Sequence, residues 1–370
     1  MKTVRFGIAG LGVMGAAHAR NILNGKVPNA VLTAVADPFS NIEAYGPEVK
    51  GFRSSEEMIK SGEIDAVVIS TPHYSHTELG ILALQDGLHV VVEKPISVHK
   101  ADAERLLAAH TNPKQVFAAM FNVRTNALYA RLRNLVKSGE LGEIQRVTWI
   151  ITTWFRTEAY YRSGGWRATW EGEGGGVLLN QCPHNLDLLW WIFGMPKKVH
   201  AFCRFGRYHN IEVEDEVTAF LEYPNGATGI FITSTGEAPG TNRLEIACDR
   251  GVVVVENDQI KWKRTEVPVS EFCATSETRM GVPPYWNVEV PYGASYENHA
   301  GILKNVVNAI LNGEELLSPA HEGIHSIELA NAMLLSTFLN QPIDLPMDSA
   351  VYEAELKKRI EESRVRRGKC

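Results

Sequence analysis

The sequence has few cysteines, and they do not occur in pairs. The five thiols belong to Cys182, Cys203, Cys248, Cys273 and Cys370 and form no C-x-x-C motif. Neither a structural zinc site nor a disulfide framework is therefore expected. The histidines also lack the spacing of metal ligands, so we expect no metal. An odd number of scattered thiols is typical of a reducing compartment.

The chain also lacks long hydrophobic runs and an excess of positive charge. No stretch approaches the roughly 18 apolar residues of a membrane span, and glycines interrupt the apolar N-terminal stretch that would otherwise resemble a secretory signal. We therefore expect a cytoplasmic protein that does not bind membranes. The formal net charge is −6, from 37 Lys+Arg against 43 Asp+Glu. This balance argues against nucleic acid as a partner, because phosphate backbones require a basic face.

The first third of the 370 residues alternates between short apolar strands and helix-length segments. The expected strands end near Ala9, Ala36, Ser70, Val92 and Met120. Strands that are apolar throughout and linked by helices predict a parallel sheet covered on both faces. With right-handed crossovers this gives a doubly wound α/β domain, which we place at residues 1–123.

Strand-type segments joined by tight turns dominate after residue 123. The turn Tyr223–Gly226 lies between two of them, and its Asn-Gly pair tolerates positive φ. Hairpin-linked strands predict an antiparallel sheet. We therefore expect residues 124–370 to form a second α/β domain with an open, mostly antiparallel sheet, and the run Val252–Val255 to be a well-buried strand.

A glycine-rich loop follows the first strand directly. Gly10, Gly12 and Gly15 form a G-x-G-x-x-G motif that encloses Val13 and Met14 and opens a helix. In dinucleotide-binding folds these glycines permit the turn, the approach of a pyrophosphate and close helix packing, in that order. The free N–H groups and positive dipole end of the helix would then bind phosphate.

Asp37 ends the second strand, 22 residues after the last glycine of the motif. This spacing suits a carboxylate that accepts hydrogen bonds from the adenosine ribose. A 2′-phosphate would be repelled by Asp37, and Pro38-Phe39 supplies no arginine to neutralise it. We therefore predict NAD rather than NADP as the cofactor.

Five further segments add to these motifs. They are Ser70–His76, Val92–Pro95 and Gly174–Asp187, together with Trp166-Arg167 and Ser138–Ile144. With the glycine loop they resemble the Gfo/Idh/MocA oxidoreductases over nearly the whole chain. The resemblance implies a Rossmann domain, a substrate domain with an open sheet, a homo-oligomer, and oxidation of a secondary alcohol of a sugar, glycoside or cyclitol.

The resemblance also implies roles for individual residues. Lys94 and His184 would be the reacting acid/base pair. The cofactor would be bordered by Thr71, Pro72, His73, His76, Glu93, Lys94, Trp166 and Arg167, in addition to the glycine loop and Asp37.

The chemistry of these two side chains agrees with that assignment. Hydride leaves a carbinol carbon as the O–H proton is lost, and a base with a pKa near the working pH removes it best. Lys94 follows a parallel strand, where open α/β sheets place their ligands. Asn180 stands where the family often has aspartate, and an amide cannot accept the proton. Which of Lys94 and His184 is the base stays open, as does a ring-orienting role for Asp187.

The substrate would meet an aromatic segment. Seven of the 22 residues from Trp149 to Trp170 are aromatic, and aromatic faces stack on sugar rings. Trp154 and Tyr160 are therefore candidate substrate contacts, with core packing as the other interpretation for each aromatic. Arg156, Arg162 and Arg167 lie among them and would suit an acidic sugar. Arg124 is a further candidate contact.

Three other functions remain open at this stage. NAD could assist the cleavage of a glycoside, or stay bound while hydride is exchanged between two sugars. The protein could also be a non-enzymatic regulator that senses the nucleotide. The presence of both Lys94 and His184 favours an enzyme.

Overall fold

The computed structural model describes residues 2–367, and its chain divides into two compact units. The first comprises Met1–Asn126, Gly172–Gly174 and Tyr296–Ile327, and the second Ala127–Glu171, Gly175–Ser295 and Glu328–Cys370. This division differs from a single boundary after residue 123. A late segment of the chain returns to the first unit because its helix carries an apolar face that covers the first sheet.

The first unit contains a six-stranded parallel sheet in the order β3-β2-β1-β4-β5-β6. Its strands are β1 (Val4–Ala9), β2 (Ala30–Ala36), β3 (Lys50–Phe52), β4 (Ala66–Ile69), β5 (His89–Val92) and β6 (Phe117–Ala119). The order reverses between β1 and β4, so a crevice for a ligand is expected there at the carboxyl ends of the strands. The doubly wound fold predicted from the sequence is confirmed.

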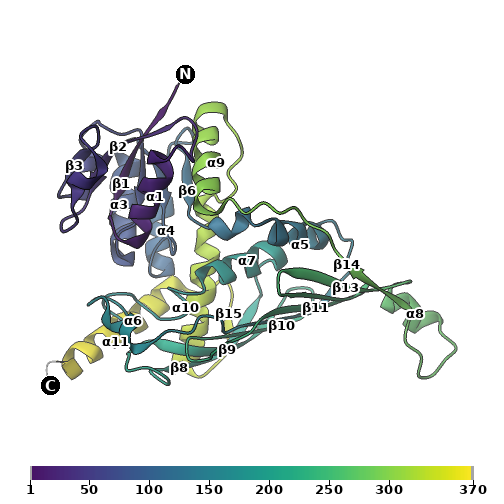
Figure 1. Cartoon of the computed structure of the whole chain (residues 1–370). Helices are drawn as coiled ribbons and strands as arrows, with labels where there is room; N and C mark the ends of the chain where they lie inside the picture. The colour runs from purple at the N-terminus through teal and green to yellow at the C-terminus, as the bar shows by residue number, and fades with distance from the viewer. Residues whose placement is uncertain (1, 368–370) are drawn as a thin grey trace. The chain divides into compact units, whose positions relative to one another are not determined.

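Helices cover both faces of this sheet (Figure 1). They are α1 (Val13–Leu23), α2 (Ser55–Ile59), α3 (His73–Gln85), α4 (Lys100–Ala108) and α9 (Asn298–Asn312), with short 3-10 turns η1 (Ile42–Tyr45), η2 (Asn122–Thr125) and η3 (Ala320–Glu322). Side chains of α1 and α9 share one buried cluster with the sheet, and those of α2, α3 and α4 share the other. The apolar face of α9 explains why the late segment belongs here.

The second unit contains a nine-stranded sheet in the order β14-β13-β12-β11-β7-β10-β9-β8-β15. Its strands are β7 (Ile144–Ile151), β8 (Lys198–Phe205), β9 (Glu214–Glu222), β10 (Thr228–Ser234), β11 (Asn242–Cys248), β12 (Gly251–Glu256), β13 (Gln259–Thr265), β14 (Tyr285–Glu289) and β15 (Ile343–Asp344). β7 pairs with β10 in parallel, and the other neighbouring strands of this sheet pair antiparallel. The expected open, mostly antiparallel sheet is therefore confirmed.

The helices of this unit are α5 (Ala127–Lys137), α6 (Glu158–Arg162), α7 (Pro183–Phe193), α8 (Val269–Thr275), α10 (Gly323–Leu339), whose first turn lies in the first unit, and α11 (Ser349–Arg367). One sheet face is buried, while Phe202 and Phe220 are about half exposed on the other. The valine run in β12 follows this alternation. Val253 and Val255 are buried, but Val252 and Val254 are only partly so. The run is a strand, as expected, but only two of its four valines are buried.

Two neighbouring buried carboxylates brace loops of the second unit. The Oε1 atom of Glu214 accepts hydrogen bonds from the backbone N–H groups of Gly176 (2.8 Å) and Leu178 (3.0 Å). A Cβ atom at Gly176 would lie 2.0 Å from the Glu214 carbonyl oxygen, so only glycine fits. Asp215 accepts from the backbone of Tyr208 in the same way. Glu214 thus holds the loop that leads into α7.

Replacing Glu214 with alanine should destabilise the protein strongly. The change leaves two backbone donors in the interior without their acceptor, which costs about 3 kcal/mol of unfolding free energy. Glu216, one residue past Asp215, is the matched control. Its ion pair with Arg207 is partly exposed, so Glu216→Ala should cost at most about 1 kcal/mol. Urea unfolding measures both, and equal losses would contradict this account of the loop.

Candidate active site

Backbone atoms pack closely against two glycines of the turn after β1. Gly10 has φ +86, and a Cβ there would lie 2.8 Å from the Ser70 carbonyl oxygen. A Cβ at Gly15 would lie only 1.8 Å from the Gly10 carbonyl oxygen, so α1 packs directly on the turn. Around Gly12, by contrast, none of the described residues comes within 4 Å of an added Cβ. Two glycines are therefore required by the fold, and the third leaves open space.

The start of α1 is suited to bind phosphate. No side chain within the described part of the chain caps its N-terminus, and its first turn, which begins at Val13 and Met14, contains no acidic residue. Nearby, the hydroxyls of Ser70 and Thr71 are buried, and no described residue bonds to them. Uncapped N–H groups, a positive dipole end and unpartnered hydroxyls suit an NAD pyrophosphate.

Asp37 lies at the carboxyl end of β2 and accepts three backbone hydrogen bonds. Its Oδ2 atom accepts from Leu11 N at 2.8 Å, and Oδ1 accepts from Phe39 N and Ser40 N at 2.9 and 2.7 Å. Burial acts to raise the pKa of Asp37, but these donors outweigh it and the pKa lies below its usual value. Asp37 is therefore a fixed anion that also braces the glycine turn.

Sequence reasoning overlooked Arg53 beside Asp37. Its Nη1 atom donates to the backbone carbonyls of Ser40 (2.9 Å) and Asp37 (3.4 Å). The side chain is exposed, and it approaches the segment from β3 rather than from the residues next to Asp37. Only the parallel pairing of β2 with β3, which local sequence does not reveal, brings this arginine here.

Glu93 and Lys94 directly follow β5. The Glu93 Oε1 atom lies 2.7 Å from His18 Nε2, and Oε2 accepts from the backbone N–H of Lys94 at 3.1 Å. His18 is fully buried, Glu93 is 4% exposed and Lys94 is half-buried. The ring of His299, at the start of α9, meets the His18 ring edge-on at 5.4 Å.

The other residues of the β4 segment are held by backbone carbonyls. The two ring nitrogens of His76 lie 2.8 Å from the carbonyl oxygens of Pro95 and Thr71. Burial lowers the pKa of His76, and the two carbonyls oppose this shift only in part. His76 thus links the turn after β4 to the turn after β5. Pro72 precedes α3, and His73 begins it and is buried with Nδ1 3.3 Å from the Glu173 carbonyl.

The contacts of Arg124 are with residues that hold the first unit together. Its buried guanidinium forms an ion pair with Glu322 and donates to the Leu317 carbonyl at 3.2 Å. The guanidinium also lies 5.7 Å from the centre of the Phe121 ring. These contacts join η2 to the late segment of the first unit. Arg124 therefore stabilises this part of the fold, and its role as a substrate contact stays a prediction.

Tyr160 is the hub of a polar cluster in the second unit. Its hydroxyl accepts from Arg167 Nη1 at 2.9 Å and from Gln181 Nε2 at 3.3 Å, and it donates to Asn180 Oδ1 at 3.4 Å. The guanidiniums of Arg156 and Arg167 lie 5.1 and 4.9 Å from the Tyr160 ring centre. Two cations therefore surround one tyrosine.

Not every aromatic of this segment belongs to a binding wall. Trp149 is buried against Phe231, and Trp170 is buried against Phe205. For these two tryptophans, core packing is the correct interpretation. Trp166 lies 4.7 Å from the Arg167 guanidinium and Trp154 5.9 Å from that of Arg156, so these two rings join the Tyr160 cluster.

His184 is the second residue of α7. Pro183 occupies the first helical position, where its missing N–H has no cost. His184 is half-buried, and Asp187 on the same helix is buried. The loop that contains Gly176 and Leu178, which Glu214 holds, leads directly into this helix. Glu214 therefore helps to fix the start of α7, where His184 lies.

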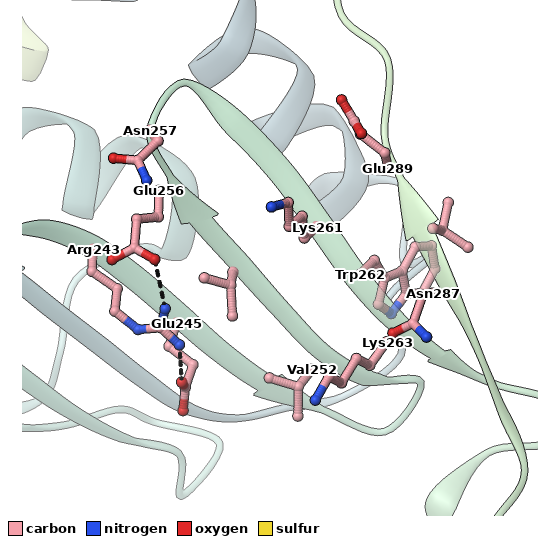
Figure 2. Close-up of a pocket in the computed structure, with 12 residues that line it drawn as sticks. Arg243, Glu245, Val252, Glu256, Asn257, Lys261, Trp262, Lys263, Asn287 and Glu289 are labelled. Carbon is pink, nitrogen blue, oxygen red and sulfur yellow. Dashed lines mark hydrogen bonds and ion pairs between the residues drawn. The ribbon is translucent and has the colours of Figure 1, made fainter.

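A separate hollow lies on the second sheet, outside these clusters. It has a volume of about 510 Å³ and is lined by strands β11 to β14 (Figure 2). Arg243 in its wall is already paired with Glu245 and Glu256 at 3.0 and 2.9 Å. None of its lining residues is a predicted site residue.

The described residues contain no group of side chains that could hold a metal ion. Within 2–367 there is also no helix able to span a membrane. Four cysteines are free thiols, and Cys370 lies outside the described residues.

Comparison with protein families decides the identity of the two units. A model described as "Oxidoreductase family, NAD-binding Rossmann fold" matches residues 4–121, and one described as "GFO/IDH/MocA C-terminal domain" matches residues 129–254. The chain belongs to the GFO/IDH/MocA oxidoreductases. The resemblance seen in the motifs is confirmed, as is NAD as the cofactor of the family's Rossmann domain.

Similar proteins cover nearly the whole chain. An inositol 2-dehydrogenase of Rhizobium meliloti is 27% identical over 364 residues, which is 93% of this chain and 99% of that protein. The WlbA dehydrogenase of Bordetella pertussis, solved with NADH and UDP-GlcNAcA, has 26% identity and a TM-score of 0.79, and the match covers 94% and 100% of the two chains. A levoglucosan dehydrogenase with 20% identity and a TM-score of 0.77 over 94% and 100% shares the fold.

Two glycine substitutions should separate folding from cofactor binding. Gly15→Ala forces a Cβ into the Gly10 carbonyl and should cost about 2 kcal/mol of unfolding free energy or more. Gly12→Ala meets open space, so it should leave stability within about 0.5 kcal/mol. Its methyl group would nevertheless obstruct the pyrophosphate and weaken NAD binding roughly tenfold or more. Thermal unfolding and NAD titration test both, and normal NAD affinity in Gly12→Ala would contradict the assigned phosphate site.

The preference for NAD over NADP should depend on the charge of Asp37. Wild-type protein should bind NAD more tightly, and Asp37→Asn should reduce the preference roughly tenfold because it removes the repulsion of a 2′-phosphate. The lowered pKa of Asp37 keeps it ionised, so the wild-type preference should not change from neutral to mildly acidic pH. Titration with both nucleotides measures this, and tighter NADP binding by the wild type would refute it.

Proposed function

We propose that this protein is an NAD-dependent dehydrogenase that oxidises a secondary hydroxyl of a sugar, glycoside or cyclitol. Its family membership supports the redox chemistry. Support for the substrate class comes from the inositol named for the Rhizobium meliloti relative and the UDP-linked sugar acid named for the Bordetella pertussis structure. We also propose a homo-oligomer, supported by the exposed Phe202 and Phe220 on the open sheet.

Lys94 and His184 are the proposed acid/base pair, and they act on the same hydroxyl. One of them accepts the hydroxyl proton while hydride leaves the adjacent carbon, and the other orients the oxygen. The position of Lys94 after β5, at the carboxyl edge of the parallel sheet, is the observation that carries this assignment. NAD supplies the hydride acceptor when bound.

Asn180 and Tyr160 would orient the substrate without taking its proton. An amide can donate and accept hydrogen bonds but cannot act as a base at neutral pH. The hydrogen bond from Tyr160 fixes the Asn180 amide. Trp166 and Arg167 are proposed to approach the cofactor, and Trp154 the sugar. Arg156 beside Tyr160 favours substrates with a carboxylate or phosphate group.

A mixture of protein, NAD and a panel of neutral and acidic sugars and cyclitols tests this function. Accumulation of NADH with one substrate class supports a dehydrogenase. Release of an aglycone without net NADH would instead indicate redox-assisted cleavage. Nucleotide binding with no turnover of any substrate would indicate a regulator and contradict the proposal.

Lys94→Ala and His184→Ala should each lower turnover at least a hundredfold, because general acid/base catalysis contributes roughly that much or more. NAD affinity should change little in His184→Ala. Lys50→Ala and His321→Ala are matched controls with the same changes at exposed positions elsewhere, and they should retain turnover. Steady-state kinetics and NAD titration measure these effects. Near-normal turnover in either site variant would remove that residue from its role.

A further inference from the structure

The position of Glu93 relative to the two halves of NAD follows from the strand order. Asp37 at the end of β2 marks the adenosine side of the sheet, and the glycine turn after β1 marks the phosphates. In the order β3-β2-β1-β4-β5-β6, the nicotinamide half must then extend over β4 to β6. Glu93 directly follows β5, so it lies on the nicotinamide side of the crevice.

Both oxygens of the Glu93 carboxylate are held in place. His18 Nε2 lies 2.7 Å from Oε1, and the backbone N–H of Lys94 donates to Oε2. Burial acts to raise the pKa of Glu93, but the hydrogen bond and charge of His18, and the charges of Lys94 and His299, lower it to about 2. The carboxylate is therefore ionised over the whole working range of pH.

Three groups face the Glu93 carboxylate, namely the rings of His18 and His299 and the side chain of Lys94. Burial lowers the pKa of His299 to about 4, so this ring is neutral near pH 7. The Nδ1 atom of His18 is buried and has no partner among the described residues. Lys94 is half-buried, and its side chain is neutral only in the case where it acts as the base of the proposed reaction.

We propose that the Glu93 carboxylate, held in place by His18, is a fixed negative charge of the cofactor site that favours NAD⁺ over NADH. The nicotinamide ring is a cation when oxidised and neutral when reduced, so a buried carboxylate on that side attracts only the oxidised form. The attraction ends once hydride has been transferred, which assists exchange of NADH for NAD⁺. The proposal deepens the cofactor part of the proposed function and does not depend on the substrate.

The test compares dissociation constants for NAD⁺ and NADH in wild type and in Glu93→Gln, without substrate. The amide keeps the size of the side chain and removes its charge. The ratio Kd(NADH)/Kd(NAD⁺) should fall roughly tenfold, the size expected when one unit charge is removed from a partly screened protein interior. The loss should arise mainly from weaker NAD⁺ binding. If Glu93→Gln has the same ratio as wild type, the proposal is overturned.

Asp65→Asn is the matched control. Asp65 is a carboxylate that directly precedes β4, at the amino ends of the parallel strands and away from the cofactor crevice. It pairs there with Arg5 at 2.7 Å. Removing this charge should leave the ratio at its wild-type value. An equal fall in both variants would show that net charge, and not the position of Glu93, sets the ratio, and would overturn the proposal.

His18→Leu tests the role of His18 and decides the matter if Glu93→Gln does not fold. Loss of the donor leaves the buried carboxylate poorly stabilised, which raises the pKa of Glu93. In His18→Leu, the ratio Kd(NADH)/Kd(NAD⁺) should then decrease as the pH is lowered from alkaline to mildly acidic. In wild type the ratio should not show this decrease. A wild-type ratio at every pH in His18→Leu overturns the proposal. Because no turnover is measured, failure of the Lys94–His184 reaction would leave these results unaffected.

Discussion

The close packing of α1 against the turn after β1 is the constraint on which the cofactor half of the molecule depends. Because Gly15 has no Cβ, the helix begins directly on the Gly10 carbonyl. This contact directs the N-terminal N–H groups of α1 to the space beside Gly12. It also places His18, one turn further along the same helix, against Glu93. One helix therefore links the phosphate site to the residue that precedes Lys94.

Carboxylates held by N–H donors occur at each part of the proposed machinery. Asp37 accepts from the glycine turn at the adenosine side, and Glu93 accepts from His18 and the Lys94 backbone on the other side. In the second unit, Glu214 fixes the loop that leads to α7. Such anions are stable inside a protein because their donors replace water. Each one positions a segment that precedes or contains a residue of the proposed site.

Local sequence was sufficient for the features that depend on neighbouring residues. The glycine spacing, the apolar parallel strands and the Asn-Gly turn all predicted structure that is present, because short-range sterics dictate them. The return of α9 to the first sheet, and the approach of Arg53 to the Asp37 segment, depend on contacts distant in sequence. His18 gave one usable signal, since it lies one turn after Gly15 on the buried face of α1. Local sequence could not show the ion pair of Arg124 either, because its partner, Glu322, lies 198 residues away.

The fate of a single hydrogen tests the central claim most directly, namely that this chain transfers hydride from a carbinol carbon to nicotinamide. A sugar or cyclitol that the enzyme oxidises would be prepared with deuterium on the reacting carbon and incubated with NAD. The account predicts deuterium at C4 of the nicotinamide in the reduced cofactor, seen by NMR, together with slower turnover of the labelled substrate. Reduced cofactor without deuterium would contradict it.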